Sequence, residues 1–222
     1  MWGGPGPDYL SRVPRLSILL IAAVLTACGS NPKAETEPPA DVRPLSLLAG
    51  LPVIIAPTQT LRAATELGWT LPPSRVVLAG LDSAVRTALV DRGPGRSWIY
   101  AETLQRSHAR NPTYSADPYA LATEPLRAGA PQAGGRLTEP LASQLRTMIA
   151  MQEARLVLLP IELRFARADS SGARAVLRLL LVDPRASEIR WIGEVKVEPV
   201  ATWSPALLTE IATRVADLVS PP

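Results

Sequence analysis

The stretch that decides the fold is residues 156–197, which read LVLLPIELRFARADSSGARAVLRLLLVDPRASEIRWIGEVKV. The segment 156–165 begins fully apolar and then alternates between apolar and charged residues, as a strand with a buried start does. Residues 173–182 form an almost continuous apolar run, which is typical of a central strand. Alternation over 189–197 predicts a third strand with one solvent-exposed face and a bulge near Ile192 and Gly193.

Two turns separate these three runs. Asp169 to Gly172 and Asp183 to Ser187 both combine Asp with Ser, Gly or Pro, the residues that turns favour. Strands joined by such short connections lie side by side and run in opposite directions. We therefore expect an antiparallel meander in the last third of the chain.

Helical and strand-like segments alternate on either side of the meander. The helices are indicated by apolar residues three to four positions apart, and the strands by short apolar runs. Thr138 and Ser204 are the expected N-caps of two helices, because a hydroxyl oxygen there can accept a backbone hydrogen bond. The expected elements are a strand over 51–56, a helix over 77–89, a strand over 97–100, a short helix over 103–109, a helix over 138–154 and a helix over 204–219.

This order predicts an α/β fold. We expect a two-layer sandwich with a mixed sheet of about five strands, ending in the antiparallel meander, and with helices packed on the sheet. The chain has 222 residues and a formal net charge of +3, and its Arg residues are scattered. A basic groove for nucleic acid is therefore not expected.

The N-terminus has the features of an export signal. Arg12 and Arg15 precede an apolar run over 16–25, which is too short to span a bilayer and is followed by Thr26, Ala27 and Cys28. The segment 25–28 resembles the lipobox of bacterial lipoproteins, whose cysteine receives diacylglycerol before cleavage ahead of it. That resemblance implies a lipid on Cys28, and the alternative is an ordinary secretory peptide with an incidental cysteine.

The domain limits follow from this signal. Residues 1–27 are expected to be the signal peptide, 28–44 the lipid anchor and a flexible tether rich in Pro and polar residues, and 45–222 a single α/β domain. Gly29 occupies the position where Asp would favour inner-membrane retention under the enterobacterial sorting rule. We expect a lipid-anchored protein on the periplasmic face of the outer membrane, with the inner membrane as the alternative.

Three segments carry a family resemblance. Residues 155–161, 176–185 and 188–195 resemble strands of periplasmic domains related to the amino-terminal domain of TolB. That group includes the curli secretion lipoprotein CsgG and the penicillin-binding-protein activator LpoB. The resemblance implies a non-enzymatic envelope domain that binds other proteins or assembles into oligomers, and it carries over no catalytic residue.

Catalytic and metal-binding patterns are weak in this sequence. His108 is the only histidine and Cys28 the only cysteine, so the usual zinc ligands cannot be assembled. Asp183, Glu188 and Glu194 are interpreted as solvated charges at turns and on an exposed strand face. We expect no enzyme activity, no cofactor and no metal.

The candidate partner-binding residues are aromatic. Trp98 and Trp191 lie in expected strands and are interpreted as core residues, whereas Trp69 is flanked by turn residues and could cap the core or contact a partner. Tyr114 and Tyr119 lie in an irregular stretch over 111–136, the second candidate contact surface.

The preferred function is therefore a protein-interaction or assembly module of the cell envelope. Its expected partners are the membrane, through lipid on Cys28, and envelope proteins or a second copy of the chain, but not nucleic acid. Two alternatives stay open at this point: an envelope hydrolase with an unrecognised site, and a carrier of a small ligand or lipid.

Overall fold

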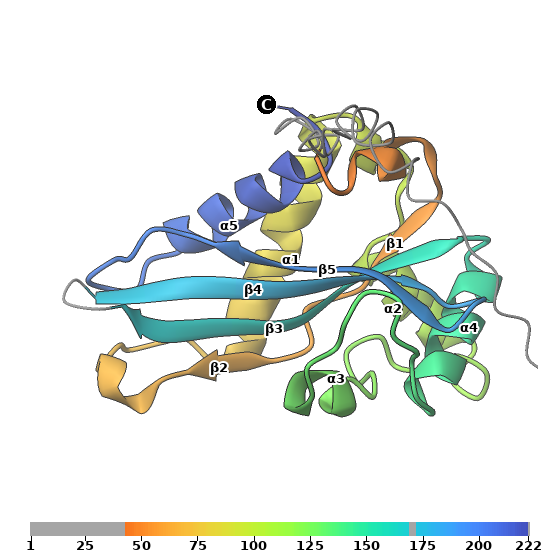
Figure 1. Ribbon diagram of the computed structural model, residues 1–222, viewed down its shortest axis with the longest axis horizontal. Coiled ribbons are helices and arrows are strands. Elements are labelled where there is room, and N and C mark those ends of the chain that lie inside the picture. The colour runs from red at the N-terminus through yellow and green to blue at the C-terminus, as the bar shows by residue number, and fades with distance from the viewer. Residues whose placement is uncertain (1–42, 169–171, 222) are drawn as a thin grey trace, which may run out of the picture. The chain divides into compact units, whose positions relative to one another are not determined.

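The computed structural model describes residues 43–168 and 172–221, and its centre is a five-stranded mixed sheet (Figure 1). The long strands β3, β4 and β5 form an antiparallel meander, and both β1 and β2 pair in parallel with the other edge of β3. The expected α/β class, mixed sheet and C-terminal meander are confirmed. The strands are β1 Val53–Ile55, β2 Leu61–Ala63, β3 Leu156–Ala168, β4 Gly172–Asp183 and β5 Glu188–Lys196.

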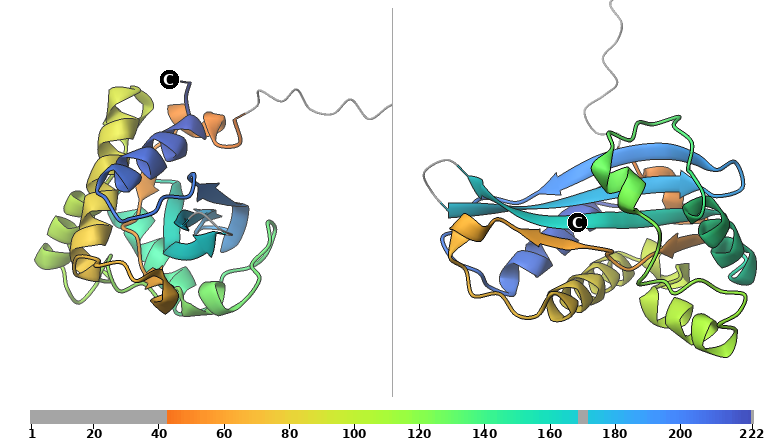
Figure 2. Two further views of the ribbon diagram at one scale, coloured as in Figure 1. Left: turned by 90° about the vertical axis from the view of Figure 1, so that its left-hand side faces the viewer. Right: turned by 90° about the horizontal axis from the view of Figure 1, so that it is seen from below.

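Five α-helices accompany the sheet in the described residues. α1 and α5 lie side by side on one face, and α4 packs on part of the opposite face (Figures 1 and 2). The helices are α1 Ser74–Asp91, α2 Ala101–Arg110, α3 Glu124–Ala128, α4 Leu141–Met151 and α5 Ala206–Asp217, with short 3-10 helices at Ser46–Gly50, Thr65–Leu67 and Pro94–Ser97.

Burial of both sheet faces explains the continuous apolar runs in β1, β3 and β4. Val53 and Ile55 pack in the core under α1 and α5, whereas Ile54 between them packs in the core under α4. The same alternation in β4 places Leu179 in the first core and Leu180 in the second. Because different helices cover the two faces of the sheet around β1, neither face is exposed to solvent there, and neither needs polar residues.

The expected strand over 97–100 is wrong. Ile99 makes a single parallel bridge with Ile54, in which Ile55 N donates to Ile99 O (2.8 Å) and Ile99 N donates to Val53 O (3.0 Å). The pairing stops there because α2 begins at Ala101. The fifth strand is instead β2, which the sequence pattern did not reveal.

The two expected N-caps are also wrong. In α4, Glu139 Oε2 accepts a hydrogen bond from Ser143 N (3.0 Å), while Thr138 contributes its carbonyl to Ala142 N (3.1 Å). In α5, Ser204 likewise contributes its carbonyl, to Leu207 N (3.2 Å). Each helix thus begins directly after a proline, which is later than we expected from Thr138 and Ser204 as N-caps.

The meander also differs in detail from the expectation. The register shift lies between Leu181, paired with Trp191, and Val182, paired with Ile189, so Arg190 is the extra residue of the bulge rather than Ile192 or Gly193. The 183–187 turn is confirmed. The 169–172 turn lies outside the described residues except for Gly172.

Candidate partner-binding site

A cavity of about 190 Å³ opens beside the loop that carries Tyr119. It is formed where the chain leaves β1, next to the middle of α1 and the first turn of α2. Its lining includes Thr58, Asp82, Tyr100, Glu102, Tyr119 and Pro160. The site thus combines residues from five separate segments of the chain.

Asp82 is the most unusual group in this cavity. Its Oδ1 accepts two hydrogen bonds from buried Thr58, one from the backbone N (2.9 Å) and one from Oγ1 (2.7 Å). Its Oδ2 is buried and accepts no hydrogen bond from any residue in the described ranges. Such an acceptor is costly to leave without a donor.

The environment of Asp82 raises its pKa from 3.8 to about 6. Desolvation by burial is the main cause, and the nearby Glu102 carboxylate raises the pKa further, while the two Thr58 hydrogen bonds lower it. The ionised carboxylate is therefore less stable here than in water, and an added positive charge would stabilise it.

Local sequence explains how this carboxylate is placed. Val77, Leu81 and Val85 form the buried stripe of α1, and Asp82 follows Leu81 at the border of that stripe. The residue faces the segment that follows β1, in which Thr58 donates from its backbone N and its hydroxyl to Asp82 Oδ1. Sequence reasoning missed Asp82, although a carboxylate directly beside an apolar stripe is a usable signal.

Tyr119 and Tyr114 project from the loop that borders the cavity. Their side chains are 43% and 78% exposed, respectively. The pKa of Tyr119 is raised, first by desolvation and then by the negative charges of Asp82, Glu102 and Asp117. Two of these carboxylates, Asp82 and Glu102, also line the cavity.

The loop is held by side chains from elsewhere in the chain. Gln59 donates from Nε2 to Pro118 O (2.9 Å) and accepts from Leu121 N (3.1 Å), and Gln144 Oε1 accepts from Ala122 N (2.9 Å). These bonds fix the backbone on both sides of Tyr119. A pre-ordered loop loses less entropy when a partner binds.

His108 belongs to the same support. Its Nδ1 lies 2.7 Å from Ser115 O, and the ring is half-buried rather than fully exposed. We interpret this contact as structural, because it joins α2 to the tyrosine loop, residues 111–123 between α2 and α3, which carries Tyr114 and Tyr119.

The tryptophans of the described residues lie apart from this cavity, in or around the core under α1 and α5. Trp98 is 5% exposed and Trp191 packs half-buried against the same core, so their expected core role is confirmed. Trp69 lies with its ring 5.5 Å from that of Phe165 and donates from Nε1 to Ala201 O (3.0 Å). These contacts indicate that Trp69 caps the core, and its role in partner binding stays a prediction.

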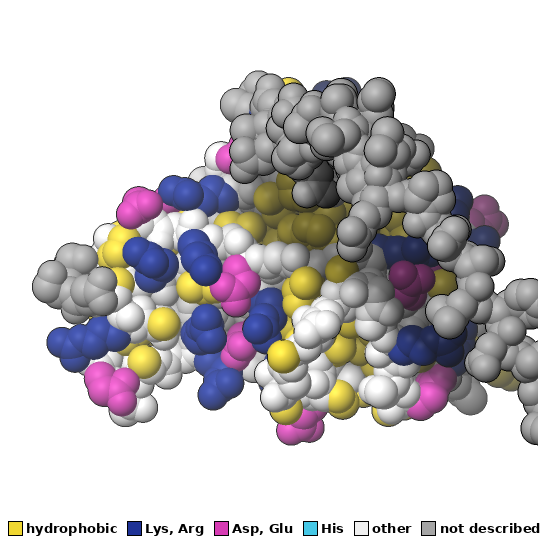
Figure 3. Space-filling model, viewed as in Figure 1, with side chains coloured by type: hydrophobic (Ala, Val, Ile, Leu, Met, Phe, Trp, Pro, Cys, Tyr) yellow, Lys and Arg dark blue, Asp and Glu magenta, His cyan; other side chains and the backbone are white. Residues whose placement is uncertain are grey.

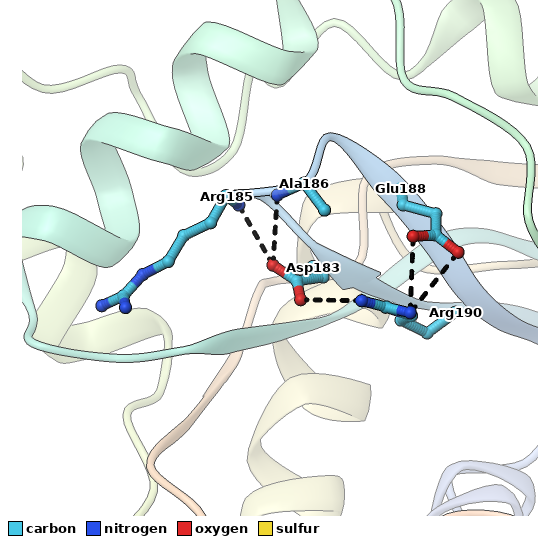
Figure 4. A network of polar contacts seen from close by, with 5 residues as sticks. All are labelled: Asp183, Arg185, Ala186, Glu188 and Arg190. Carbon is cyan, nitrogen blue, oxygen red and sulfur yellow. Dashed lines mark hydrogen bonds and ion pairs between the residues drawn. The ribbon is translucent and has the colours of Figure 1, made fainter.

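The three carboxylates considered in the meander form ion pairs. Figure 4 shows Asp183 accepting from Arg185 N (3.2 Å) and Ala186 N (3.3 Å), with Arg190 between it and Glu188. Asp183 is only 7% exposed, so its interpretation as a solvated charge is wrong. The network stabilises the β4–β5 turn, and the Asp183 carboxylate is already bound within it.

Acidic and basic side chains lie together on the surface at the end of the sheet that contains β2. Figure 3 shows acidic and basic side chains intermingled where β2, β3 and β4 are labelled in Figure 1. Glu194 lies 3.7 Å from Arg178 and 3.2 Å from Lys196, and Glu162 lies 3.4 Å from Arg62. The pairs of Glu194 lie at the surface, where such pairs contribute roughly 0–1 kcal/mol each, whereas the Glu162 side chain is only 7% exposed.

Within residues 43–168 and 172–221, no group of three or more His, Cys, Asp or Glu could hold a metal ion. In the same ranges, no helix has the length and apolar character needed to cross a membrane. Cys28, the expected lipidation site, lies outside the described residues.

Comparison with known proteins gives only distant likenesses. No protein-family model matches the chain. No curated protein matches it either. The chain is similar in structure to the LpoB C-terminal domain from Salmonella enterica, with 13% identity, a TM-score of 0.40 and coverage of 67% of this chain and 83% of that one.

Two further solved structures are similar at the same level. The PelC dodecamer from Paraburkholderia phytofirmans has 11% identity, a TM-score of 0.38 and coverage of 78% of this chain and 91% of that one. Lipoprotein GNA1162 from Neisseria meningitidis has 13% identity, a TM-score of 0.39 and coverage of 74% and 93%. At this level the likenesses carry no argument about function, and the resemblance to TolB and CsgG stays a prediction.

Proposed function

We propose that this chain is a membrane-anchored periplasmic lipoprotein whose α/β domain is a non-catalytic protein-interaction or assembly module of the cell envelope. The observation that supports it best is the exposure of Tyr114 and Tyr119 on a loop whose backbone is held near Tyr119 by Gln59 and Gln144, and next to Tyr114 by His108. Rigid exposed tyrosines beside a cavity are characteristic of protein contact surfaces. The partner is an envelope protein or a second copy of the chain.

The size of the cavity favours this function over small-ligand carriage. Pockets for drug-sized ligands span roughly 300–1,000 Å³, and the cavity beside Tyr119 has about 190 Å³. A larger hollow of about 360 Å³ along α2 is lined by Arg106, Arg110 and Asn111, all exposed. Neither space has the enclosed apolar character that a lipid requires.

The anchor is tested on Cys28. We expect mass spectrometry of native membrane material to show a mature chain that begins at Cys28 and carries acyl chains, because residues 25–28 match the lipobox. Cys28→Ser should release the protein from the membrane fraction, since two or more acyl chains are needed for stable anchoring. An unmodified thiol, or a chain that retains residues 1–27, would contradict the anchor.

The interaction surface is tested by removing its rings. The double change Tyr114→Ala and Tyr119→Ala should reduce crosslinking to the partner in intact cells at least tenfold, because loss of central aromatic contacts at an interface costs about 2 kcal/mol or more. Leu47→Ala, at a residue that is 85% exposed, serves as the matched control and should leave crosslinking unchanged. Undiminished crosslinking of the double variant would reject this loop as the contact surface.

A further inference from the structure

We propose that a groove along α2 binds an extended acidic segment of the partner protein through Arg96, Arg106 and Arg110. The inference rests on the proposed function and adds the chemistry of the partner. The α2 groove consists of two hollows, of about 360 Å³ and about 300 Å³, which meet at Thr103 and Arg106.

Basic residues dominate the lining of the α2 groove. Arg106 and Arg110 line the first hollow, which no acidic residue lines. The second hollow is lined by Arg86 and Arg96 together with Glu102, whose carboxylate lies 3.4 Å from Arg86. Because that pair is neutral as a whole, the remaining three arginines give the groove a positive charge, which attracts carboxylates.

These three arginines are exposed and have no carboxylate partner. Arg96 and Arg110 form no hydrogen bond or ion pair with any residue in 43–168 or 172–221. Arg106 donates from Nε to Glu102 O (3.3 Å) and from Nη2 to Thr103 Oγ1 (3.2 Å), and neither acceptor is a carboxylate. The two bonds orient the Arg106 guanidinium and leave its other N–H groups for a ligand.

Capping of α2 does not account for Arg110. The residue lies in the last turn of the helix, where an arginine commonly donates to the carbonyls that the helix leaves free. Arg110 donates to none of them in the described chain. Glu153, next to the lining residue Gln152, forms no ion pair with it either. The charge of Arg110 is therefore available to a partner.

The α2 groove is continuous with the tyrosine loop. Asn111 lines the first hollow and is also the first residue of that loop. A small adjoining hollow is lined both by Met151 of the groove and by Ser115 of the loop. A protein that contacts the tyrosine loop can therefore extend a segment along α2 over adjoining surface. This continuity favours a segment of the same partner over an unrelated anion.

The charge pattern favours a peptide over a nucleic acid. A guanidinium binds a carboxylate through two parallel N–H donors, so each arginine suits one Asp or Glu side chain. Glu102 lies one helical turn before Arg106 and repels a strand that carries a phosphate at every nucleotide. A peptide can instead place acidic residues opposite the arginines and a neutral residue opposite Glu102.

The test uses the full chain in detergent and three fluorescent probes. The first is a peptide in which Asp and Glu alternate with Gly, the second has Asn and Gln in their place, and the third is a single-stranded oligothymidylate of similar length. Fluorescence anisotropy should show the acidic peptide binding about tenfold or more tightly than the neutral one, because charge-assisted hydrogen bonds are the stronger ones. Its binding should weaken about fivefold when the ionic strength rises from about 0.01 M to 0.15 M, since salt screens exposed charges.

Charge-reversal variants make the test specific. Arg110→Glu and Arg96→Glu, at the two ends of the groove, should each weaken the acidic peptide about fivefold or more. Arg75→Glu makes the same charge change at an exposed residue of α1 that lines neither hollow, and should stay within about twofold of the wild type. Thermal unfolding of each variant shows that it is folded. Arg110→Gln, which removes the charge without adding a repulsive one, should weaken the peptide about two- to fivefold.

The outcomes separate this inference from the proposed function. Equal binding of the two peptides, tighter binding of the oligothymidylate, or full binding to Arg110→Glu would overturn the acidic-segment groove. In cells, Arg106→Glu combined with Arg110→Glu should reduce crosslinking to the partner about fivefold. If crosslinking persists in that variant while the tyrosine variant loses its partner, the groove is rejected and the proposed function stands. If the acidic peptide binds as expected while the tyrosine variant keeps its partner, the groove is supported and the tyrosine loop is not the contact surface.

Discussion

Replacing Phe165 by alanine is expected to destabilise the domain by about 3–5 kcal/mol, the usual cost of removing a fully buried aromatic ring. Phe165 is 0% exposed, and its ring centroid lies 5.5 Å from those of both Trp69 and Trp203. The ring therefore joins β3 to two segments that are distant in sequence. Its loss leaves a cavity and removes both aromatic contacts.

Urea unfolding followed by circular dichroism measures this effect. Val76→Ala, on α1 at a side chain that is 53% exposed, is the control and should change the free energy of unfolding by less than about 0.5 kcal/mol. A change below about 1 kcal/mol for Phe165→Ala would mean that the core under α1 and α5 is not packed as described.

The second large effect is the pH dependence of stability that Asp82 causes. Its pKa is about 6 in the folded chain, against an ordinary value of 3.8, so the folded state holds the proton more tightly than the unfolded state. The stability that this group contributes is fully present below about pH 4 and is lost as the pH rises through 6. Two pKa units correspond to about 3 kcal/mol.

Asp82→Asn isolates this contribution, because the amide does not titrate. The free energy of unfolding of the wild type minus that of the variant should fall by about 3 kcal/mol between pH 3.5 and pH 7. Val76→Ala, on the same helix, removes no titrating group and should show no comparable slope relative to the wild type. A flat difference for Asp82→Asn would show that the carboxylate is not desolvated in the folded chain.

The sequence predicted the meander and the long helices because their signals are periodic and local. β4 and α1 both have apolar patterns that extend over at least ten residues, so burial of one or two faces can be inferred directly. β2 has only three residues, Leu61–Ala63, with Arg62 in the middle, and its pairing with Leu163 to Phe165 fixes it as a strand. A partner that lies about a hundred positions away leaves no local signal.

The candidate site was predicted in part. Tyr114 and Tyr119 could be selected because they are aromatic residues in a stretch rich in Pro, Asp and Asn. The cavity could not be predicted from the sequence. It forms because Thr58 contacts Asp82, which is 24 positions further along the chain, and because α2 places Glu102 nearby. The periodicity of apolar residues indicates which face of α1 is buried. It does not indicate which segment of the chain packs against a residue at the edge of that face, such as Asp82.

The central claim is that the tyrosine loop contacts another protein, and site-specific photocrosslinking in living cells tests it most directly. With a photoreactive phenylalanine analogue in place of Tyr119, we expect one discrete adduct: an envelope protein, or a species of twice the chain mass if the chain assembles with itself. The analogue at Leu47 should give no such adduct. Absence of an adduct at position 119, or the same adduct from both positions, would contradict the claim.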